Sequence, residues 1–144
     1  MTELPNENLK RFVAVLNKKV EPGRAMNALG HMTAGLAGGS DKANEMCFLQ
    51  YEDKNGGIHP NISHYPFIVL KADNSNKIRT VRNECLRRGI PFSDFTSTMT
   101  VGTSQEQQNA TRSTPEEELE YWSIVMFGST DELKEFTGKF SLYN

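Results

Sequence analysis

Residues 12–39, FVAVLNKKVEPGRAMNALGHMTAGLAGG, contain the pattern that decides the fold. Residues 12–20 begin with an apolar, β-branched run that is typical of a buried strand. Pro22 and Gly23 interrupt this run, and the fixed backbone torsion of proline suits a first helical turn. From residue 23 to residue 37, apolar residues recur at helical spacing, and Gly38-Gly39 ends the segment. A buried strand that leads directly into a helix predicts an α/β fold.

Three more apolar segments predict strands at residues 46–51, 65–71 and 121–127. The segment at 65–71 is apolar on both faces, which favours a central position in a sheet. Residues 90–95 lead into a Thr/Ser-rich stretch at 96–100, for which no element is predicted.

Two helices are predicted after the first one. Residues 75–88 are amphipathic and are followed by Gly89, and their predicted apolar face carries Ile78, Val81, Cys85 and Leu86. Ser129 to Glu132 form a capping-box sequence, which predicts a short helix that ends at Gly138.

The remaining segments predict turns and loops. Asp53 to Gly57 contain an Asn-Gly turn signal, and residues 58–64 follow it as a loop. Residues 105–113 (QEQQNATRS) are polar throughout and predict a surface loop. Residues 114–117 (TPEE) resemble a capping box with proline at its first position, which predicts one helical turn.

Strand–helix alternation predicts a three-layer α/β/α fold with a small mixed sheet of four to five strands. A chain of 144 residues has room for one such domain, expected at residues 11–144 after a flexible N-terminus of residues 1–10. No run approaches the ~20 apolar residues of a membrane span, and the polar start has no secretory signal. We therefore expect a cytoplasmic protein, in which Cys47 and Cys85 act as small buried hydrophobic residues rather than as a disulfide.

The net charge of −2 argues against a protein coated in positive charge for nucleic acid. It conceals an asymmetry, since residues 1–90 carry a net +4 and residues 91–144 a net −6. A locally basic face is therefore compatible with the sequence, and a solvated surface explains the same split.

The first candidate site lies at the start of the first predicted helix. Gly23 lets the backbone approach a ligand, and Arg24 places a permanent cation beside the N–H groups of the first turn. Arg24, Asn27 and His31 are spaced i, i+3 and i+7, so they share one polar stripe. A cation at the positive end of a helix is unfavourable, so its presence there suggests an anionic partner. Alternatively, Arg24 pairs with a surface carboxylate and His31 covers an edge of the core.

The second candidate site is the stretch FSDFTST at residues 92–98. Asp94 lies between aromatic residues, and desolvation there would raise its pKa and suit a general base. Thr98 could orient a water molecule for it. Alternatively, Asp94 begins a turn by bonding the backbone two residues on.

Other chemistry has weaker support. His59 and His64 have neither cysteines nor closely spaced carboxylates beside them, so no metal site is expected, and no cofactor motif is present. Trp122 is expected in the core, and the acidic run at residues 116–120 on a solvated face.

Five segments in this order resemble an uncharacterised bacterial family, a domain of unknown function numbered two thousand: PGRAMNALGHMTAGLAGG, PFIVLKAD, GIPFSDFTSTM, EYWSIVMFG and LKEFTGKFSLY. The resemblance covers roughly residues 11–143. That family is thought to share the fold of the type II peptidyl-tRNA hydrolases, which cleave the ester between a peptide and tRNA. The resemblance implies this fold, and by analogy a homodimer.

Site residues of these hydrolases match in part. Their glycine, histidine, aspartate and threonine fall on Gly23, His31, Asp94 and Thr98, and a threonine-glycine pair near the end falls on Thr137-Gly138. The lysine position holds Arg24, which does not exchange protons near neutral pH but can bind phosphate. The glutamine position holds Ala28 and a later glycine position holds Thr96. If the glutamine serves the transition state, its loss would cost on the order of 10²–10³ in rate.

Three functions follow as hypotheses. The first is a binding module that kept an anion-binding cleft and lost the chemistry, recognising a small anion, an RNA or nucleotide end, or a protein. The second is a hydrolase of an ester such as peptidyl- or aminoacyl-tRNA, with Asp94 activating water, Thr98 orienting it and Arg24 holding negative charge. The third is an enzyme for an unrelated small substrate. For RNA, phosphate contacts are expected from Lys77, Arg79, Arg82, Arg87 and Arg88.

Overall fold

The computed structural model describes residues 3–144 and contains a five-stranded mixed sheet. The predicted flexible terminus, residues 1–10, lies partly outside the described residues, and its last residue, Lys10, already belongs to a strand. In spatial order the strands are β5 (Phe92–Thr96), β6 (Tyr121–Ser129), β1 (Lys10–Asn17), β4 (Phe67–Ala72) and β7 (Ser141–Leu142). The β1–β4 pair is parallel and the other pairs are antiparallel.

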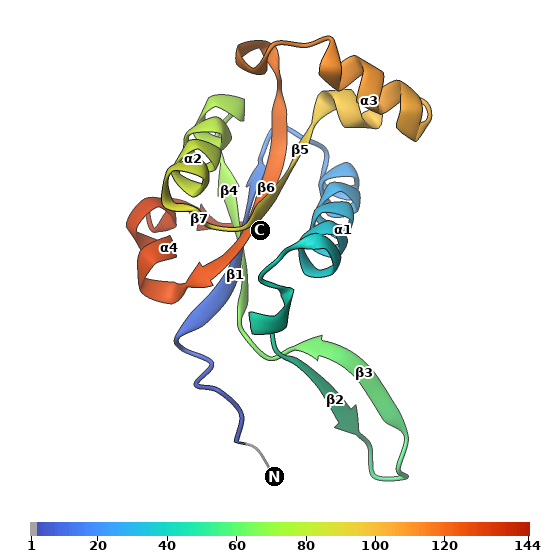
Figure 1. Cartoon of the computed structure of the whole chain (residues 1–144), viewed down its shortest axis with the longest axis vertical. Helices are drawn as coiled ribbons and strands as arrows, with labels where there is room; N and C mark the ends of the chain where they lie inside the picture. Colours follow the sequence, from blue (N-terminus) through green and yellow to red (C-terminus); the bar gives the residue numbers. More distant parts are fainter. Residues whose placement is uncertain (1–2) are drawn as a thin grey trace.

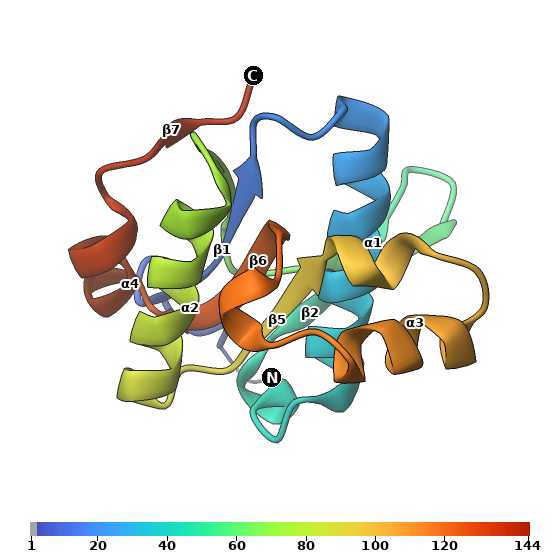
Figure 2. The same ribbon diagram turned by 90° about the horizontal axis from the view of Figure 1, so that it is seen from above.

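Helices cover both faces of this sheet, as the alternation predicted (Figures 1 and 2). Helix α1 (Pro22–Gly39) packs on one face, and α2 (Ser75–Arg88) and α4 (Thr130–Thr137) pack on the other. Alternate residues of β1 serve the two cores. Phe12, Ala14 and Leu16 pack with α1, whereas Val13 and Val15 pack with α2 and α4.

The connections place the ends of several strands and helices at the same end of the sheet. The chain runs from β1 through α1, and then through a separate pair of strands, to β4 beside β1. It continues through α2 on the other face to β5 at the far edge. The carboxyl ends of β1, β4 and β5 therefore lie at the same end as the N-termini of α1 and α2. Open α/β sheets bind their ligands at this end.

Residues 105–113 are not a loop. They form most of α3 (Ser104–Arg112), which begins with a capping box between Thr103 and Glu106. The helix packs on η2, a 3₁₀ turn at Ser97–Thr100, and none of its residues is buried. Without an apolar stripe, the sequence carries no periodic signal for this helix.

A two-stranded sheet stands apart from the main one. The predicted strand at 46–51 is present as β2 (Phe48–Glu52), and the predicted Asn-Gly turn connects it to β3 (Ile58–Ser63). The prediction of a loop at 58–64 was therefore wrong. The hairpin projects away from the helices and the main sheet (Figure 1).

Smaller differences concern ends and faces. The helical turn after Pro115 is present as η3 (Glu116–Glu118), but no side chain caps it, so no capping box forms there. Leu86 is 55% exposed instead of buried, because it lies about 100° around α2 from Cys85.

Both cysteines are free, and Cys85 is buried as expected. Burial raises the pKa of the Cys85 thiol to about 12. Cys47 is half-buried beside the core under α1. Across residues 3–144, no helix combines the length and the apolar character that a membrane crossing requires.

Candidate functional site

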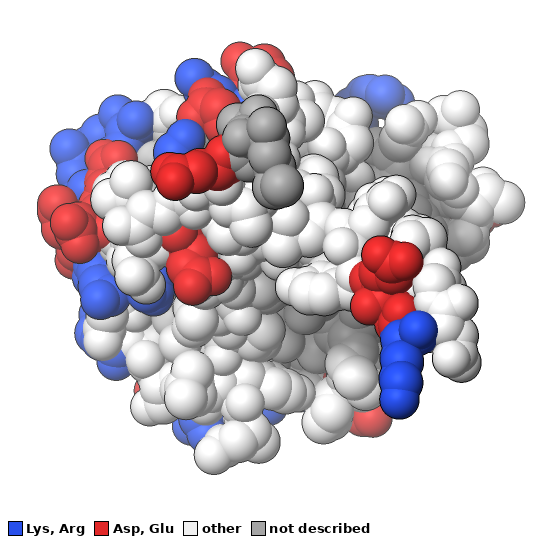
Figure 3. Space-filling view, turned by 90° about the horizontal axis from the view of Figure 1, so that it is seen from below, with Lys and Arg blue, Asp and Glu red and all other residues white. Residues whose placement is uncertain are grey.

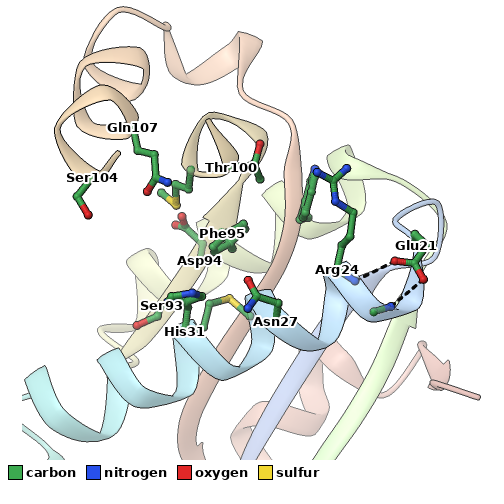
Figure 4. Close-up of a pocket in the computed structure, with 14 residues that line it drawn as sticks. Glu21, Arg24, Asn27, His31, Ser93, Asp94, Phe95, Thr100, Ser104 and Gln107 are labelled. Atoms are coloured by element: carbon green, nitrogen blue, oxygen red, sulfur yellow. Dashed lines mark hydrogen bonds between the residues drawn. The ribbon is translucent and has the colours of Figure 1, made fainter. Parts of the chain in front are cut away.

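A cleft of about 760 Å³ lies between the N-terminal half of α1, strand β5 and the segment from η2 to α3 (Figure 4). We refer to it as the α1–β5 cleft. Its lining residues are Glu21, Gly23, Arg24, Asn27, His31, Met32, Ser93, Asp94, Phe95, Met99, Thr100, Ser104, Gln107 and Trp122. Both predicted stretches, the start of the first helix and the region around Asp94, therefore contribute to one concave surface.

The predicted polar stripe of α1 forms one wall of the cleft. Ala25, Ala28 and Met32 are buried against the sheet and fix the orientation of the helix. Arg24 and Asn27 occupy the neighbouring stripe and are exposed to the cleft. His31 continues this stripe, and its ring stacks near Phe95 of β5 at a centroid distance of 6.3 Å.

The helix N-terminus already holds an anion, the carboxylate of Glu21. Its oxygens accept hydrogen bonds from Gly23 N–H (3.0 Å) and Arg24 N–H (3.1 Å), and these bonds lower the pKa of Glu21. A Cβ on Gly23 would stand 3.2 Å from a Glu21 carboxylate oxygen, so the glycine makes room for this cap. The expectation that these N–H groups face a ligand is therefore wrong. The sequence signal for the cap was Glu21 itself, an acidic residue directly before Pro22.

Unlike these N–H groups, the guanidinium of Arg24 is not bound to a carboxylate of the described chain. It lies over the ring of Trp122, 5.3 Å from the centroid, and forms no ion pair with any residue of the described chain. Pairing with a surface carboxylate is thus not observed. Trp122 was expected in the core, but it is half-buried and lines the cleft.

Asp94 lies on β5 with its side chain 16% exposed. Its Oδ2 accepts a hydrogen bond from Arg82 Nε of α2 at 2.8 Å. Burial raises the pKa of Asp94, and the Arg82 guanidinium opposes this shift without reversing it. Asp94 makes no turn-forming bond to the backbone within residues 3–144, and its Oδ1 accepts no hydrogen bond there.

Thr98 does not line the α1–β5 cleft. Its hydroxyl is hydrogen-bonded to the hydroxyls of Thr96 (2.7 Å) and Thr111 (2.8 Å), so it connects η2 to α3. The structure therefore brings Arg24, Asn27 and His31 together on one wall of the cleft and leaves Thr98 outside it. Asp94 borders the cleft from β5, but its side chain points to the α2 face of the sheet, as Phe92 does, and binds Arg82 there.

The third wall of the cleft was not anticipated from the sequence. Met99 and Thr100 come from η2, and Ser104 and Gln107 come from α3. Sequence reasoning missed these residues because it treated the α3 segment as a loop. The capping pair Thr103 and Glu106 was the available signal for a helix there.

The arginines of α2 do not form an open basic face. Arg79 binds Glu116 (2.9 Å), Arg87 binds Glu84 (2.7 Å) and Arg88 binds Glu135 (3.0 Å). Figure 3 shows blue and red groups intermingled on the side where α2 and α4 lie. Glu116 also accepts a hydrogen bond from the Tyr121 hydroxyl, so this part of the acidic run is not merely solvated.

A second cleft, of about 710 Å³, lies at the carboxyl ends of β1 and β4 and shares Glu21, Arg24 and Trp122 with the first. Its far wall carries Glu117, Glu118 and Glu120, which disfavours an anionic ligand there. Within residues 3–144, no cluster of three or more His, Cys, Asp or Glu side chains is arranged to hold a metal ion.

Comparison with known proteins finds one family profile and similar solved structures. A family profile described as "Protein of unknown function (DUF2000)" matches residues 10–144. A solved structure of a protein of unknown function from Agrobacterium tumefaciens strain C58 is similar, with a TM-score of 0.80 and 15% sequence identity. The similarity covers 94% of this chain and 98% of that chain. A search of curated proteins returned no match. At this identity the structural similarity concerns the fold alone.

Proposed function

The chain belongs to the DUF2000 family, and we propose that it acts as a binding module that holds an anionic group of its ligand on Arg24 in the α1–β5 cleft. The observation that carries this proposal is the unpaired guanidinium of Arg24. It lines the cleft, lies over Trp122 and has no carboxylate partner within residues 3–144.

The charges of the α1–β5 cleft support an anionic ligand, because the glutamates of the second cleft that Arg24 also borders, Glu117, Glu118 and Glu120, lie on the far wall of that second cleft. Two carboxylates line the α1–β5 cleft, and each is already bound elsewhere, Glu21 by the N–H groups of α1 and Asp94 by Arg82. The stacking on Trp122 restricts the guanidinium, so less conformational entropy is lost on binding. Arginine binds carboxylates and phosphates through two parallel hydrogen bonds. Asn27 and Gln107 add neutral donors and acceptors to the walls of the cleft.

Binding can be tested with pyrophosphate and adenosine monophosphate as probes, by calorimetry and by the shift in thermal unfolding. Binding to the folded state raises the free energy of unfolding by RT ln(1 + [L]/Kd). We expect Arg24→Gln to weaken binding about ten-fold or more, because one charge-assisted interaction is lost.

The matched control is Arg87→Gln, which makes the same change of charge at an exposed arginine outside the cleft. It should leave the affinity for both probes unchanged. Equal losses in the two variants would point to nonspecific attraction and would contradict the proposal.

A second candidate is an ester hydrolase with a fold similar to the type II peptidyl-tRNA hydrolases. The observation that favours it is Asp94, which lines the cleft and has a pKa raised by burial, as a general base requires. Three features count against it. The Asp94 side chain points to the α2 face of the sheet, Arg82 occupies one of its carboxylate oxygens, and Thr98 is bonded to other hydroxyls outside the cleft.

The hydrolase is tested with peptidyl-tRNA as substrate. If Asp94 activates water, hydrolysis should fall at least 10²-fold in Asp94→Asn while binding of the substrate persists. Activity that is absent in the natural chain, or equal in the variant, would leave only the binding module.

A further inference from the structure

A further hollow, separate from the second cleft described above, continues the α1–β5 cleft along strand β5. It has a volume of about 520 Å³ and lies between the C-terminal part of α1 and the start of β5. Gly35, Gly39 and Asp41 line it on the side of α1, and Phe92 and Ser93 line it on the side of β5. Because Ser93 lines both hollows, together they follow β5 along most of its length, and we call them the β5 groove.

Strand β5 lies at the edge of the sheet, so one side of its backbone has no partner strand within the described chain. Phe127 N–H donates to Pro91 C=O at 3.2 Å, which fixes the phase of the ladder between β5 and β6. Since bonded positions alternate in an antiparallel pair, the N–H and C=O groups of Phe92 and Asp94 point away from β6. An edge of this kind accepts an added strand.

The opposite wall of the β5 groove is one stripe of α1. Arg24, Asn27, His31, Gly35 and Gly39 follow one another at spacings of three or four residues. The two glycines have no side chains to fill the groove. A Cβ on Gly39 would meet no atom within 4 Å, and one on Gly35 would stand 3.8 Å from Ser93 Oγ. The groove is therefore open at the glycine end and polar at the Arg24 end.

The charge of the groove selects the occupant. Arg24 is its cation without an ion-pair partner in residues 3–144, and Glu21 and Asp94 are held by other groups. Asp41 lies at the far end, beyond Gly39, and forms no ion pair within residues 3–144, so it repels an acidic side chain there and restricts the carboxylate of a ligand to the Arg24 end. A planar base would find little room on Trp122, because Arg24 covers the ring and Phe95 lies 5.8 Å from it. An extended chain satisfies the free backbone groups of Phe92 and Asp94, and an acidic side chain on it satisfies Arg24.

We infer that the β5 groove binds an extended acidic segment of a partner protein, which adds a strand to β5 and places a carboxylate on Arg24. This inference rests on the proposed function for the anionic group and adds the ligand class. In strand addition, backbone hydrogen bonds supply affinity and pockets for alternate side chains supply specificity.

The test uses hexapeptides in which serine and valine alternate and one glutamate takes each position in turn. Acetyl and amide ends leave the glutamate as the only charge. Binding to the full chain is followed by amide chemical shifts and hydrogen exchange. For the best peptide we expect slowed exchange at the Phe92 and Asp94 amides. Replacing its glutamate by glutamine, or making Arg24→Gln in the protein, should weaken binding about ten-fold or more.

Two controls separate strand addition from simple anion binding. Gly35→Leu fills the groove away from Arg24 and should abolish peptide binding while leaving pyrophosphate binding intact. Gly38→Leu makes the same change on the same helix at a residue that lines neither hollow, and peptide binding should survive. Backbone N-methylation of the peptide at alternate residues should also abolish binding, because the ladder bonds are then blocked.

Three outcomes would overturn the inference. Pyrophosphate binding that depends on Arg24, with no peptide bound, leaves the proposed function standing and removes the peptide. Peptide binding that is unchanged in Gly35→Leu places the peptide elsewhere. A chain that is dimeric by ultracentrifugation and becomes monomeric in Gly35→Leu shows that a second copy occupies the edge. If neither probe responds to Arg24→Gln, the proposed function fails as well.

Discussion

Glu21 changes how the start of α1 can be used. An arginine at the positive end of a helix suggests an external anion, but the carboxylate three residues earlier already caps the N–H groups of Gly23 and Arg24. The cost of placing Arg24 there is therefore offset within the chain. An external anion can therefore bind the Arg24 guanidinium but not the capped N–H groups of the helix. For this reason Arg24→Gln is the substitution that tests anion binding in the α1–β5 cleft.

Asp94 gives a prediction about pH. Burial raises its pKa above the ordinary value of about 3.9, so the folded chain holds this proton more tightly than the unfolded chain. This proton adds to the free energy of unfolding. The contribution is fully present below the unfolded-state pKa of about 3.9 and is lost as the pH rises through the folded-state pKa. Relative to Asp94→Asn, the natural chain should therefore lose stability as the pH rises from about 3.9 through the folded-state pKa, as measured by urea unfolding.

Arg82 provides the control for this prediction. Its guanidinium opposes the shift of Asp94, so Arg82→Gln should raise the pKa of Asp94 further and extend the loss of stability to higher pH. A stability difference between the natural chain and Asp94→Asn that stays constant, or that moves in favour of the natural chain with rising pH, would contradict the assignment.

The elements differ in how strongly the core holds them. Helix α4 has the side chains of Leu133 and Phe136 in the core, whereas no residue of α3 is buried. The capping box at Thr103 and the Thr98–Thr111 hydrogen bond are therefore important for holding α3. Because α3 supplies Ser104 and Gln107 to the α1–β5 cleft, its stability bears on the site directly.

Removing the cap of α3 should have a local effect. Thr103→Ala removes a cap worth about 1 kcal/mol. Since no side chain of α3 is itself buried, its amides should exchange about five-fold faster while the melting temperature changes by less than about 1 °C. Hydrogen exchange followed by mass spectrometry measures the first effect and calorimetry the second.

Ser129→Ala is the matched control at the N-cap of α4, where Ser129 Oγ accepts a hydrogen bond from Glu132 N–H. Here the same loss of about 1 kcal/mol should lower the global free energy of unfolding, because α4 opens only with the core. If Thr103→Ala lowers global stability as much as Ser129→Ala does, α3 is part of the cooperative unit.

Periodicity decided which elements the sequence could reveal. Strands β1, β4 and β6 and helices α1 and α2 have apolar positions that face a core, and each was predicted with its order. Helix α3 and strand β3 have no such positions, and a proline such as Pro60 is uncommon inside a strand. Helical spacing was sufficient to group Arg24, Asn27 and His31. Their distance from Asp94 depends on β5 lying beside α1, which no local pattern specifies.

The molecule as a whole consists of a packed three-layer body and a hairpin that contributes little to it. The buried residues of the core under α1 include Met46 before the hairpin and Tyr65 after it, but none from β2 or β3. Phe48, Tyr51, Ile58 and Ile62 are each about half exposed on the hairpin. A two-stranded sheet without further packing has marginal stability in water. Cooperative unfolding of the body should therefore be independent of the hairpin.

Limited trypsin digestion tests this independence. Lys54 lies exposed in the turn between β2 and β3, so the bond after it should be the first internal site to be cut. The nicked chain should keep its melting temperature to within about 3 °C, which is less than about 1 kcal/mol for a domain of this size. Lys54→Gln should remove this first cut without altering the melting temperature. A nicked chain that unfolds many degrees lower would mean that the hairpin stabilises the body through contacts beyond those of the core.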